Sequence, residues 1–212
     1  MHILEPMTVA TDYALSVLGL VLGYRLRKSA GPEGLSGRLW AGMLLAMAVA
    51  AFAGGTSHGF ADRLGVTGNW ALWRLTVWSI GIAGWCIVAA TARFAFSTIV
   101  GRWVTALFAA QFAIYAVWMV WHDDFGYVIL EYVSAMVLVA AVSLWRWFGH
   151  GWAGGPWVVG GILVSFLAAG VQMSGFALHE HFNHNDLYHV IQMAGFILLY
   201  RGGGMLGDRP GG

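Results

Sequence analysis

The chain has 212 residues, of which 59% are apolar and only 10% are charged, and its mean hydropathy is +0.70. Because about a quarter of the residues of a soluble domain are charged, this composition excludes an ordinary cytosolic enzyme. A net charge of +1 excludes the basic surface of a nucleic-acid-binding protein, and a single cysteine, Cys86, excludes a disulfide framework. The sequence therefore predicts an integral membrane protein.

Seven stretches are long and apolar enough, or nearly so, to form membrane-spanning helices, which need about 20 mostly apolar residues. They cover residues 8–24, 39–60, 70–92, 103–121, 127–147, 156–178 and 187–200. The last is short, and we expect its helix to begin earlier, near Asn183. We predict an all-α membrane protein, a seven-transmembrane helix bundle with one domain over residues 1–201 and a flexible cytoplasmic tail over residues 202–212.

The basic residues predict how this bundle is oriented. Nine of the 11 Lys and Arg residues fall on one side if the spans alternate, and Arg63 and Arg74 are the exceptions. Short loops that carry Lys and Arg stay on the cytoplasmic side of a membrane. We therefore expect the N-terminus outside and the C-terminus in the cytoplasm, in a multi-pass protein of a bacterial inner (plasma) membrane.

Most acidic residues and histidines collect at the opposite, outer face. Eight of the ten acids and seven of the eight histidines fall at or near it. An ionisable group inside a span costs a few kcal/mol unless it is paired, so each such group is a candidate functional residue. Five lie within or at the end of a span near this face: Asp12, His58, Arg74, Glu131 and His189.

Two local patterns place histidines at helix ends. Residues 54–60 combine glycines, which permit close helix packing, with Ser57 and His58. Residues 183–189 combine a capping asparagine with Asp186 and His189, which are three positions apart and so share a helical face. A carboxylate beside a metal-ligating histidine fixes its tautomer and raises its basicity.

These histidines predict a zinc site. His58, His184 and His189 would supply three imidazoles, a usual ligand set for a catalytic zinc with an open fourth position. Such a zinc makes hydroxide available for hydrolysis near neutral pH. A carboxylate would be a fourth ligand, the partner of a ligand or the general base, and the spacing leaves four candidates: Asp12, Asp62, Glu131 and Asp186.

The same features give a family resemblance. Seven spans, a histidine at the end of span two and residues 186–191 at the start of span seven resemble the CREST superfamily of membrane hydrolases, which includes alkaline ceramidases and progestin/adiponectin receptors. The resemblance implies a zinc held by three histidines near the membrane surface on the N-terminal side, and hydrolysis of a lipid amide or ester.

The sequence departs from the pattern of that family at three places. Gly54 stands where the family has a serine four positions before the histidine, with Ser57 as the nearest substitute. Asn185 stands where the family has a histidine four positions before His189, and span three lacks the family's carboxylate. If helical, the five positions from His184 to His189 turn the two side chains about 140° apart, so His184 would have to precede the helix to share a metal with His189.

Three functions remain open on the sequence alone. The first is a zinc-dependent hydrolase of a lipid amide or ester at the outer face, in which Arg74 could stabilise an anionic headgroup or oxyanion. The second is a non-catalytic membrane subunit or ligand-binding, receptor-like protein that binds membrane lipids or a membrane-protein partner. The third is a haem or copper redox protein. A retinal protein is excluded because the only lysine, Lys28, lies outside the last span.

Overall fold

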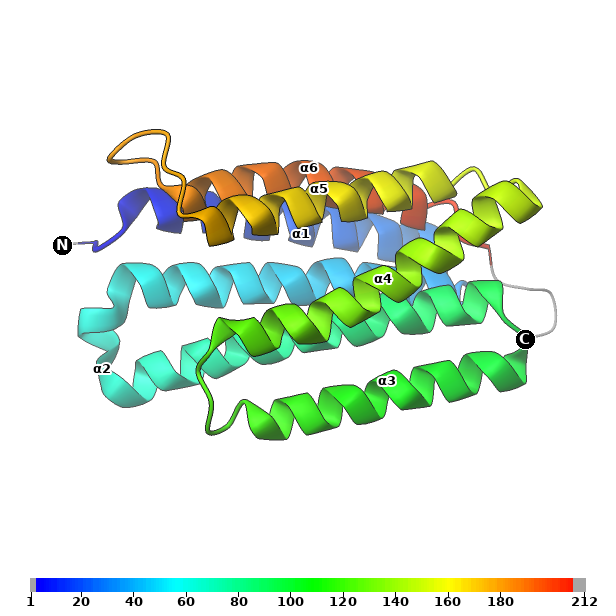
Figure 1. Ribbon diagram of the computed structural model, residues 1–212, viewed down its shortest axis with the longest axis horizontal. Helices are drawn as coiled ribbons and strands as arrows, with labels where there is room; N and C mark the ends of the chain where they lie inside the picture. Colours follow the sequence, from blue (N-terminus) through cyan, green and yellow to red (C-terminus); the bar gives the residue numbers. More distant parts are fainter. Residues whose placement is uncertain (1–2, 208–212) are drawn as a thin grey trace.

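A computed structural model describes residues 3–207, and this part of the chain contains six α-helices and no β-strand. The helices are α1 Pro6–Ala30, α2 Leu35–Ala95, α3 Thr98–Trp118, α4 Phe125–His150, α5 Gly155–Ser174 and α6 His184–Gly203. They run alternately up and down as one elongated bundle, with short connections at its two ends (Figure 1).

The 61-residue helix α2 turns back on itself, and Figure 1 shows its two arms running in opposite directions. The backbone leaves the helical region at Phe60 and again at Gly65, where φ is +64°. A residue without a Cβ adopts such a positive φ at no steric cost. The first arm therefore covers residues 35–59 and the second arm residues 66–95.

The prediction of seven separate spanning helices is wrong for the described chain, which forms six helices. The predicted second and third spans belong to α2, because the polar residues between them continue in helical turns. Five helices, α1 to α5, are long and apolar enough to cross a membrane. Helix α6 is not among them, because its first turns carry polar residues. The chain is a multi-pass membrane protein.

The start of the last helix is as expected. Asn183 is the N-cap of α6, and its side chain accepts hydrogen bonds from the backbone N–H groups of Asn185 and Asp186. The Asp186 carboxylate accepts one in return from the Asn183 N–H. This capping box stabilises the first turn of a helix and fixes the positions of Asp186 and His189.

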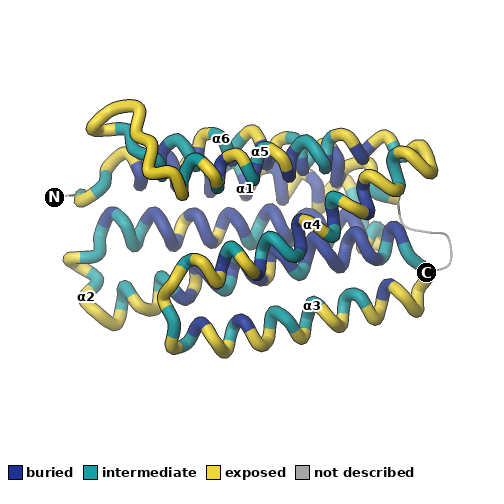
Figure 2. The backbone as a smooth tube through the Cα atoms, viewed as in Figure 1, coloured by how far each residue is buried: buried dark blue, intermediate teal, exposed yellow. Residues whose placement is uncertain are grey.

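The core lies where α1, both arms of α2, α4, α5 and α6 pack together, and α2 carries many of the buried residues in Figure 2. Trp40 of α2 is fully buried, and its indole N–H donates to the Leu199 carbonyl of α6 at 2.9 Å. Helix α3 lies at the edge of the bundle and buries only Gly101 and Tyr115. Its exposed apolar face suits contact with lipid.

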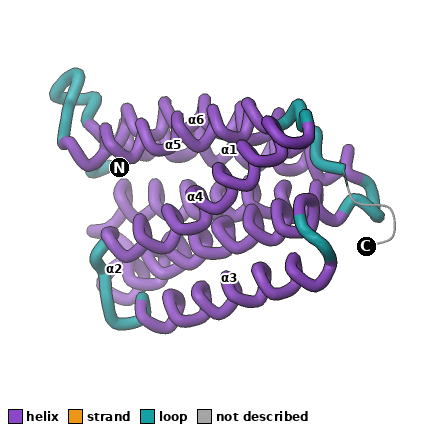
Figure 3. The backbone as a smooth tube through the Cα atoms, turned by 45° about the vertical axis from the view of Figure 1, so that its right-hand side comes forward, coloured by secondary structure: helices purple, strands orange, loops and turns teal. Residues whose placement is uncertain are grey.

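The two ends of the bundle differ in what they bring together (Figure 3). The amino end, as we call it, carries the start of α1, the turn of α2 near residues 60–65, and the loops 119–124 and 175–183. The carboxyl end carries the turns near residues 31–34, 96–97 and 151–154 and the end of α6. Residues 208–212 of the predicted tail lie outside the described residues.

Candidate functional site

The centre of the candidate site is a buried pair between the first and last helices at the amino end. The Nε2 atom of His189 on α6 lies 3.0 Å from Oδ1 of Asp12 on α1. Their side chains are only 9% and 6% exposed. No arginine or lysine pairs with Asp12 in the described chain. The charge of this aspartate is therefore balanced only through the imidazole or through something bound beside it.

The other ring nitrogen of His189 contacts Thr11, the residue before Asp12 on α1. This Nδ1 atom lies 3.0 Å from the Thr11 hydroxyl. That hydroxyl can also donate to the backbone carbonyls of Met7 and Thr8, at 3.0 and 3.1 Å. The same hydroxyl is the partner of His189 Nδ1, and which of the two groups donates depends on the tautomer of the imidazole.

The position of the imidazole proton determines how His189 and Asp12 interact. With the proton of a neutral imidazole on Nδ1, the Nε2 atom carries a lone pair and faces a carboxylate oxygen of Asp12. Two acceptors do not attract each other at 3.0 Å. In this tautomer the contact needs a second proton or a cation between His189 and Asp12, whereas in the Nε2–H tautomer His189 donates directly to Asp12.

A second buried carboxylate stands next to this pair. Asp186 is 1% exposed, and its Oδ2 atom accepts the hydrogen bond of the capping box at 2.7 Å. Its Oδ1 atom is buried and has no hydrogen-bond partner in the described chain. Asp186 lies close enough to Asp12 for their charges to interact. An unpartnered carboxylate oxygen in a buried site is costly, so this oxygen is available for a proton or a cation.

His58 and Glu5 complete the cluster from the surface. His58 Nδ1 lies 3.5 Å from Glu5 Oε1, and both side chains are about 40% exposed. His58 is also near enough to His189 for an electrostatic interaction. Gly55 lets α2 approach α1, because a Cβ at this position would lie 2.7 Å from the Asp12 Cβ. We call Asp12, His58, Asp186 and His189 the amino-end cluster.

His184 does not join this cluster as a third imidazole ligand. It is the first residue of α6 and lies five positions before His189 within the same helix. No group of three or more His, Cys, Asp or Glu side chains in the described chain is arranged to hold a metal ion. The zinc and its three-histidine ligand set therefore stay predictions.

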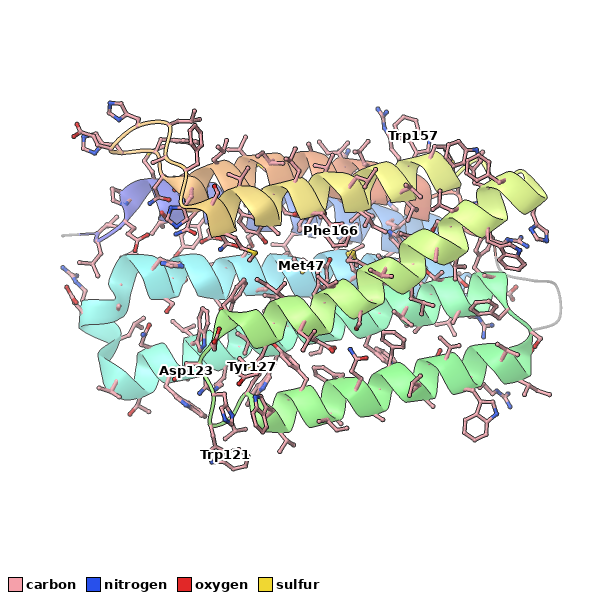
Figure 4. The ribbon with its side chains drawn as sticks, viewed as in Figure 1. Met47, Trp121, Asp123, Tyr127, Trp157 and Phe166 are labelled. Carbon is pink, nitrogen blue, oxygen red and sulfur yellow. The ribbon has the colours of Figure 1, made fainter. Side chains whose placement is uncertain are left out.

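The other predicted site residues form separate contacts. Ser57 donates to Asn69 Oδ1 between the two arms of α2, at 2.5 Å. Asp62 is exposed at the turn of α2. Arg74 is buried, lies over Trp70 and binds Asp123, which is labelled in Figure 4, at 2.5 Å and the Val120 carbonyl at 3.1 Å. Arg74 therefore holds the loop between α3 and α4.

Glu131 is buried on α4, where the Gln111 amide of α3 donates to its carboxylate and to Ser134. Gln172 likewise donates across a helix interface, to Asn185. Both glutamines thus have the role that deep polar groups in membrane bundles usually have, hydrogen bonding between helices.

Thr11 is the functional residue that sequence reasoning missed. A threonine in the first turns of an apolar helix carries no signal of its own. Its position next to Asp12 was the available clue, because two adjacent polar residues of α1 can engage both nitrogens of one imidazole. Finding it would have required knowing that α1 packs on α6.

A small pocket with a cavity volume of about 60 Å³ lies beside the cluster, between α2, α4, α5 and α6. Met47 of α2 and Phe166 of α5 line it and are labelled in Figure 4. Tyr188 also lines it, and its ring lies 5.1 Å from that of His189. The buried Tyr132 hydroxyl has no hydrogen-bond partner in the described chain. The pocket is therefore mainly apolar, with a few polar groups near His189.

Comparison with known proteins gives a family and no relative of established function. No curated protein and no solved structure matches the chain. A family model described as a family of unknown function, DUF6962, matches residues 7–208. This match covers all six helices and includes the whole amino-end cluster, but it shows no link to the CREST superfamily. The chain belongs to the DUF6962 family.

Proposed function

We propose that this protein is a zinc-dependent membrane hydrolase of a lipid amide or ester, with its site in the amino-end cluster. The observation that carries the proposal is the contact of the buried His189 Nε2 with the buried Asp12 Oδ1 at 3.0 Å, which brings an imidazole nitrogen and a carboxylate oxygen together. Two ligand atoms on one tetrahedral zinc lie about 3.3 Å apart, since Zn–N and Zn–O bonds are about 2.0–2.2 Å long. The pair therefore fits a shared zinc ion.

The donor chemistry supports zinc over harder metals. Imidazole nitrogen and carboxylate oxygen are both zinc ligands, and the Thr11 hydroxyl would accept from Nδ1–H when Nε2 binds the metal. Metal-ligating histidines almost always donate their other N–H to such a partner. His58 is the proposed third ligand, because it is near His189 and its half-exposed side chain has room to turn. This set replaces the predicted His184 with Asp12.

The chain's own groups then have separate tasks. A zinc ion bound there would polarise a carbonyl group and make water more acidic. Asp186 Oδ1 has free lone pairs and is positioned to take a proton, while the capping box holds its other oxygen. The small apolar pocket beside Tyr188 would receive an apolar part of the substrate. Arg74 is engaged by Asp123, so we leave it out of this machinery.

The resemblance to the CREST superfamily and the charge distribution support the location of the site. The amino end carries Glu5, Asp12, Asp62, Asp123 and Glu180 among its acids, whereas the carboxyl end carries most arginines. Under the positive-inside rule, the proposed orientation has the amino end outside. In a bacterial inner membrane the cluster would then face the periplasm.

A second candidate function is a non-catalytic subunit or receptor-like protein that binds a lipid or a membrane protein. The absence of a three-ligand metal group in the described chain favours it. In this case a shared proton, and no metal, would join His189 to Asp12. The buried pair would then only fasten α1 to α6.

Metal content separates the two candidates. The full-length protein, purified in detergent without chelators, is analysed by elemental mass spectrometry together with the variants H189A, D12N and H181A. His181 is the matched control, since it is an exposed histidine at the same end, 79% exposed and paired only with Glu180. We expect about one zinc per chain in the wild type and in H181A, and loss of most of it in H189A and D12N.

Two results would contradict the hydrolase. A wild-type protein without zinc would favour the non-catalytic function. Zinc retained in both H189A and D12N would place the metal elsewhere. Where zinc is present and depends on the cluster, release of fatty acid from lipid amides and esters then tests the reaction itself.

A further inference from the structure

The carboxyl end of the bundle, opposite the amino-end cluster, contains a second and larger groove. It has a cavity volume of about 470 Å³ and lies between the start of α2, the end of its second arm and the first half of α3. Trp85 lies across it and donates its indole N–H to the Thr105 carbonyl at 3.3 Å. The groove thus lies between α2 and α3, which run side by side (Figures 1 and 3).

The outer part of the groove is chemically suited to an anion. Arg93 of α2 and Arg102 of α3 both line it, and no lining residue is acidic. The hydroxyl groups of Thr98 and Thr105 line the same space. Helix α3 also begins here, and the amino end of a helix carries a partial positive charge. Arginine binds phosphate through two parallel hydrogen bonds.

The inner part of the groove is apolar and narrow. On α2, Trp85, Ala89 and Arg93 follow at intervals of four and so share one face. On α3, Arg102, Ala106 and Ala109 follow at intervals of four and three. On both helices the arginine therefore stands at the end of the bundle, and small or apolar side chains continue inward. From Arg102 to Ala109 the groove extends roughly 10 Å, at about 1.5 Å per residue.

We propose that this groove binds one anionic phospholipid from the leaflet at the carboxyl end, with its phosphate between Arg93 and Arg102 and an acyl chain along Ala106 and Ala109. The charge complementarity of the outer part and the apolar walls of the inner part each match one end of such an amphiphile. Basic pockets between transmembrane helices on the cytoplasmic side bind anionic headgroups in this way. This site is separate from the proposed zinc site and does not depend on it.

Native mass spectrometry of the full-length protein in detergent tests the proposal. The probes are phosphatidylglycerol and phosphatidylcholine with identical acyl chains, and glycerol 3-phosphate. We expect one phosphatidylglycerol to bind at least tenfold more tightly than phosphatidylcholine. Glycerol 3-phosphate, which lacks acyl chains, should not displace it at equal concentration.

Three variants locate the site. R93Q/R102Q should weaken phosphatidylglycerol binding at least tenfold. R25Q/R27Q removes the same charge from two exposed residues of α1 at the same end of the bundle, outside the groove, and should leave binding unchanged. A109W fills the apolar part without changing charge and should also weaken binding, which separates loss of the site from loss of net charge. Thermal unfolding of each variant checks that it is folded.

The proposal is overturned by equal affinity for the two lipids, by equal loss in R25Q/R27Q, or by unchanged binding in folded A109W. Displacement by glycerol 3-phosphate would also overturn it, because it would show that a free phosphate is the occupant.

Discussion

His189 has both ring nitrogens engaged by adjacent residues of α1, at 3.0 Å from Thr11 and 3.0 Å from Asp12. The Thr11 hydroxyl is therefore the partner of one nitrogen while Nε2 faces the carboxylate. Sequence reasoning selected Asp12 and His189 separately, one as a candidate base and one as a ligand. It could not pair them, because Thr11 and His189 are 178 positions apart and no spacing rule joins such distant residues.

The variant T11V tests this role of the hydroxyl. Valine has nearly the shape of threonine but lacks the hydroxyl, so the buried Nδ1 atom of His189 is left without its hydrogen-bond partner. Such a loss costs about 1–3 kcal/mol. Removing the partner of a ligating histidine typically lowers metal affinity about 10–100-fold. We expect a lower unfolding temperature in detergent and weaker zinc binding in a chelator competition.

Thr91 provides the matched control for T11V. It is equally buried, but its hydroxyl donates only to the Ile87 carbonyl of its own helix at 2.8 Å, far from the amino-end cluster. T91V removes a donor from a carbonyl within its own helix and leaves no ring nitrogen without a partner, so it should destabilise the protein less than T11V and should leave zinc binding unchanged. If T11V and T91V behave alike, the hydroxyl does not orient His189.

At the scale of the helices, α1 and α2 meet through glycines at the amino end. A Cβ at Gly55 would lie 2.7 Å from the Asp12 Cβ, and one at Gly59 would lie 2.4 Å from a methyl carbon of Val9. The sequence predicted close packing from the glycines of residues 54–60, and this is confirmed. It did not predict the fusion of the second and third spans, because Asp62, Arg63 and Asn69 have the polar character of a loop while their backbone is helical.

The variant G55A tests whether this close approach positions the cluster. The added methyl group forces α1 away from α2 and shifts Asp12 relative to His189. Overpacking of this kind costs about 1–3 kcal/mol, and we expect lower thermal stability together with reduced zinc binding.

G170A is the control for this substitution in α5, because a Cβ at Gly170 meets no atom within 4 Å. Replacing a helical glycine by alanine there should stabilise the protein by up to about 1 kcal/mol. A stable G55A variant with normal zinc content would show that the contact between Gly55 and Asp12 does not set the site.

The two candidate sites lie at opposite ends of the molecule. The amino-end cluster combines carboxylates and histidines, and the groove at the carboxyl end combines arginines with apolar walls. Hydropathy and charge were sufficient to predict helices, their approximate positions and the gathering of acids at one end. They were not sufficient for the groove, because Arg93 and Arg102 come together only through the packing of α3 against α2.

The same separation of charge predicts the orientation of the bundle in the membrane, which can be measured by thiol labelling. In a C86A background, which removes the one native cysteine, single cysteines are introduced by Asp62→Cys at the amino end and by Glu33→Cys at the carboxyl end. Both native side chains are exposed. A membrane-impermeant maleimide should label the Asp62→Cys variant in intact spheroplasts. The Glu33→Cys variant should react only after the membrane is disrupted, because the positive-inside rule predicts that the arginine-rich carboxyl end lies in the cytoplasm.

Equal labelling of both variants in disrupted membranes shows that both thiols are reactive, so a difference in intact cells reports sidedness alone. The reverse pattern would place the amino-end cluster in the cytoplasm. The proposed hydrolase would then act on lipids of the inner leaflet, and the arginine groove would face a leaflet to which the positive-inside rule does not assign it. Orientation thus decides which membrane surface supplies the substrate of one site and the lipid of the other.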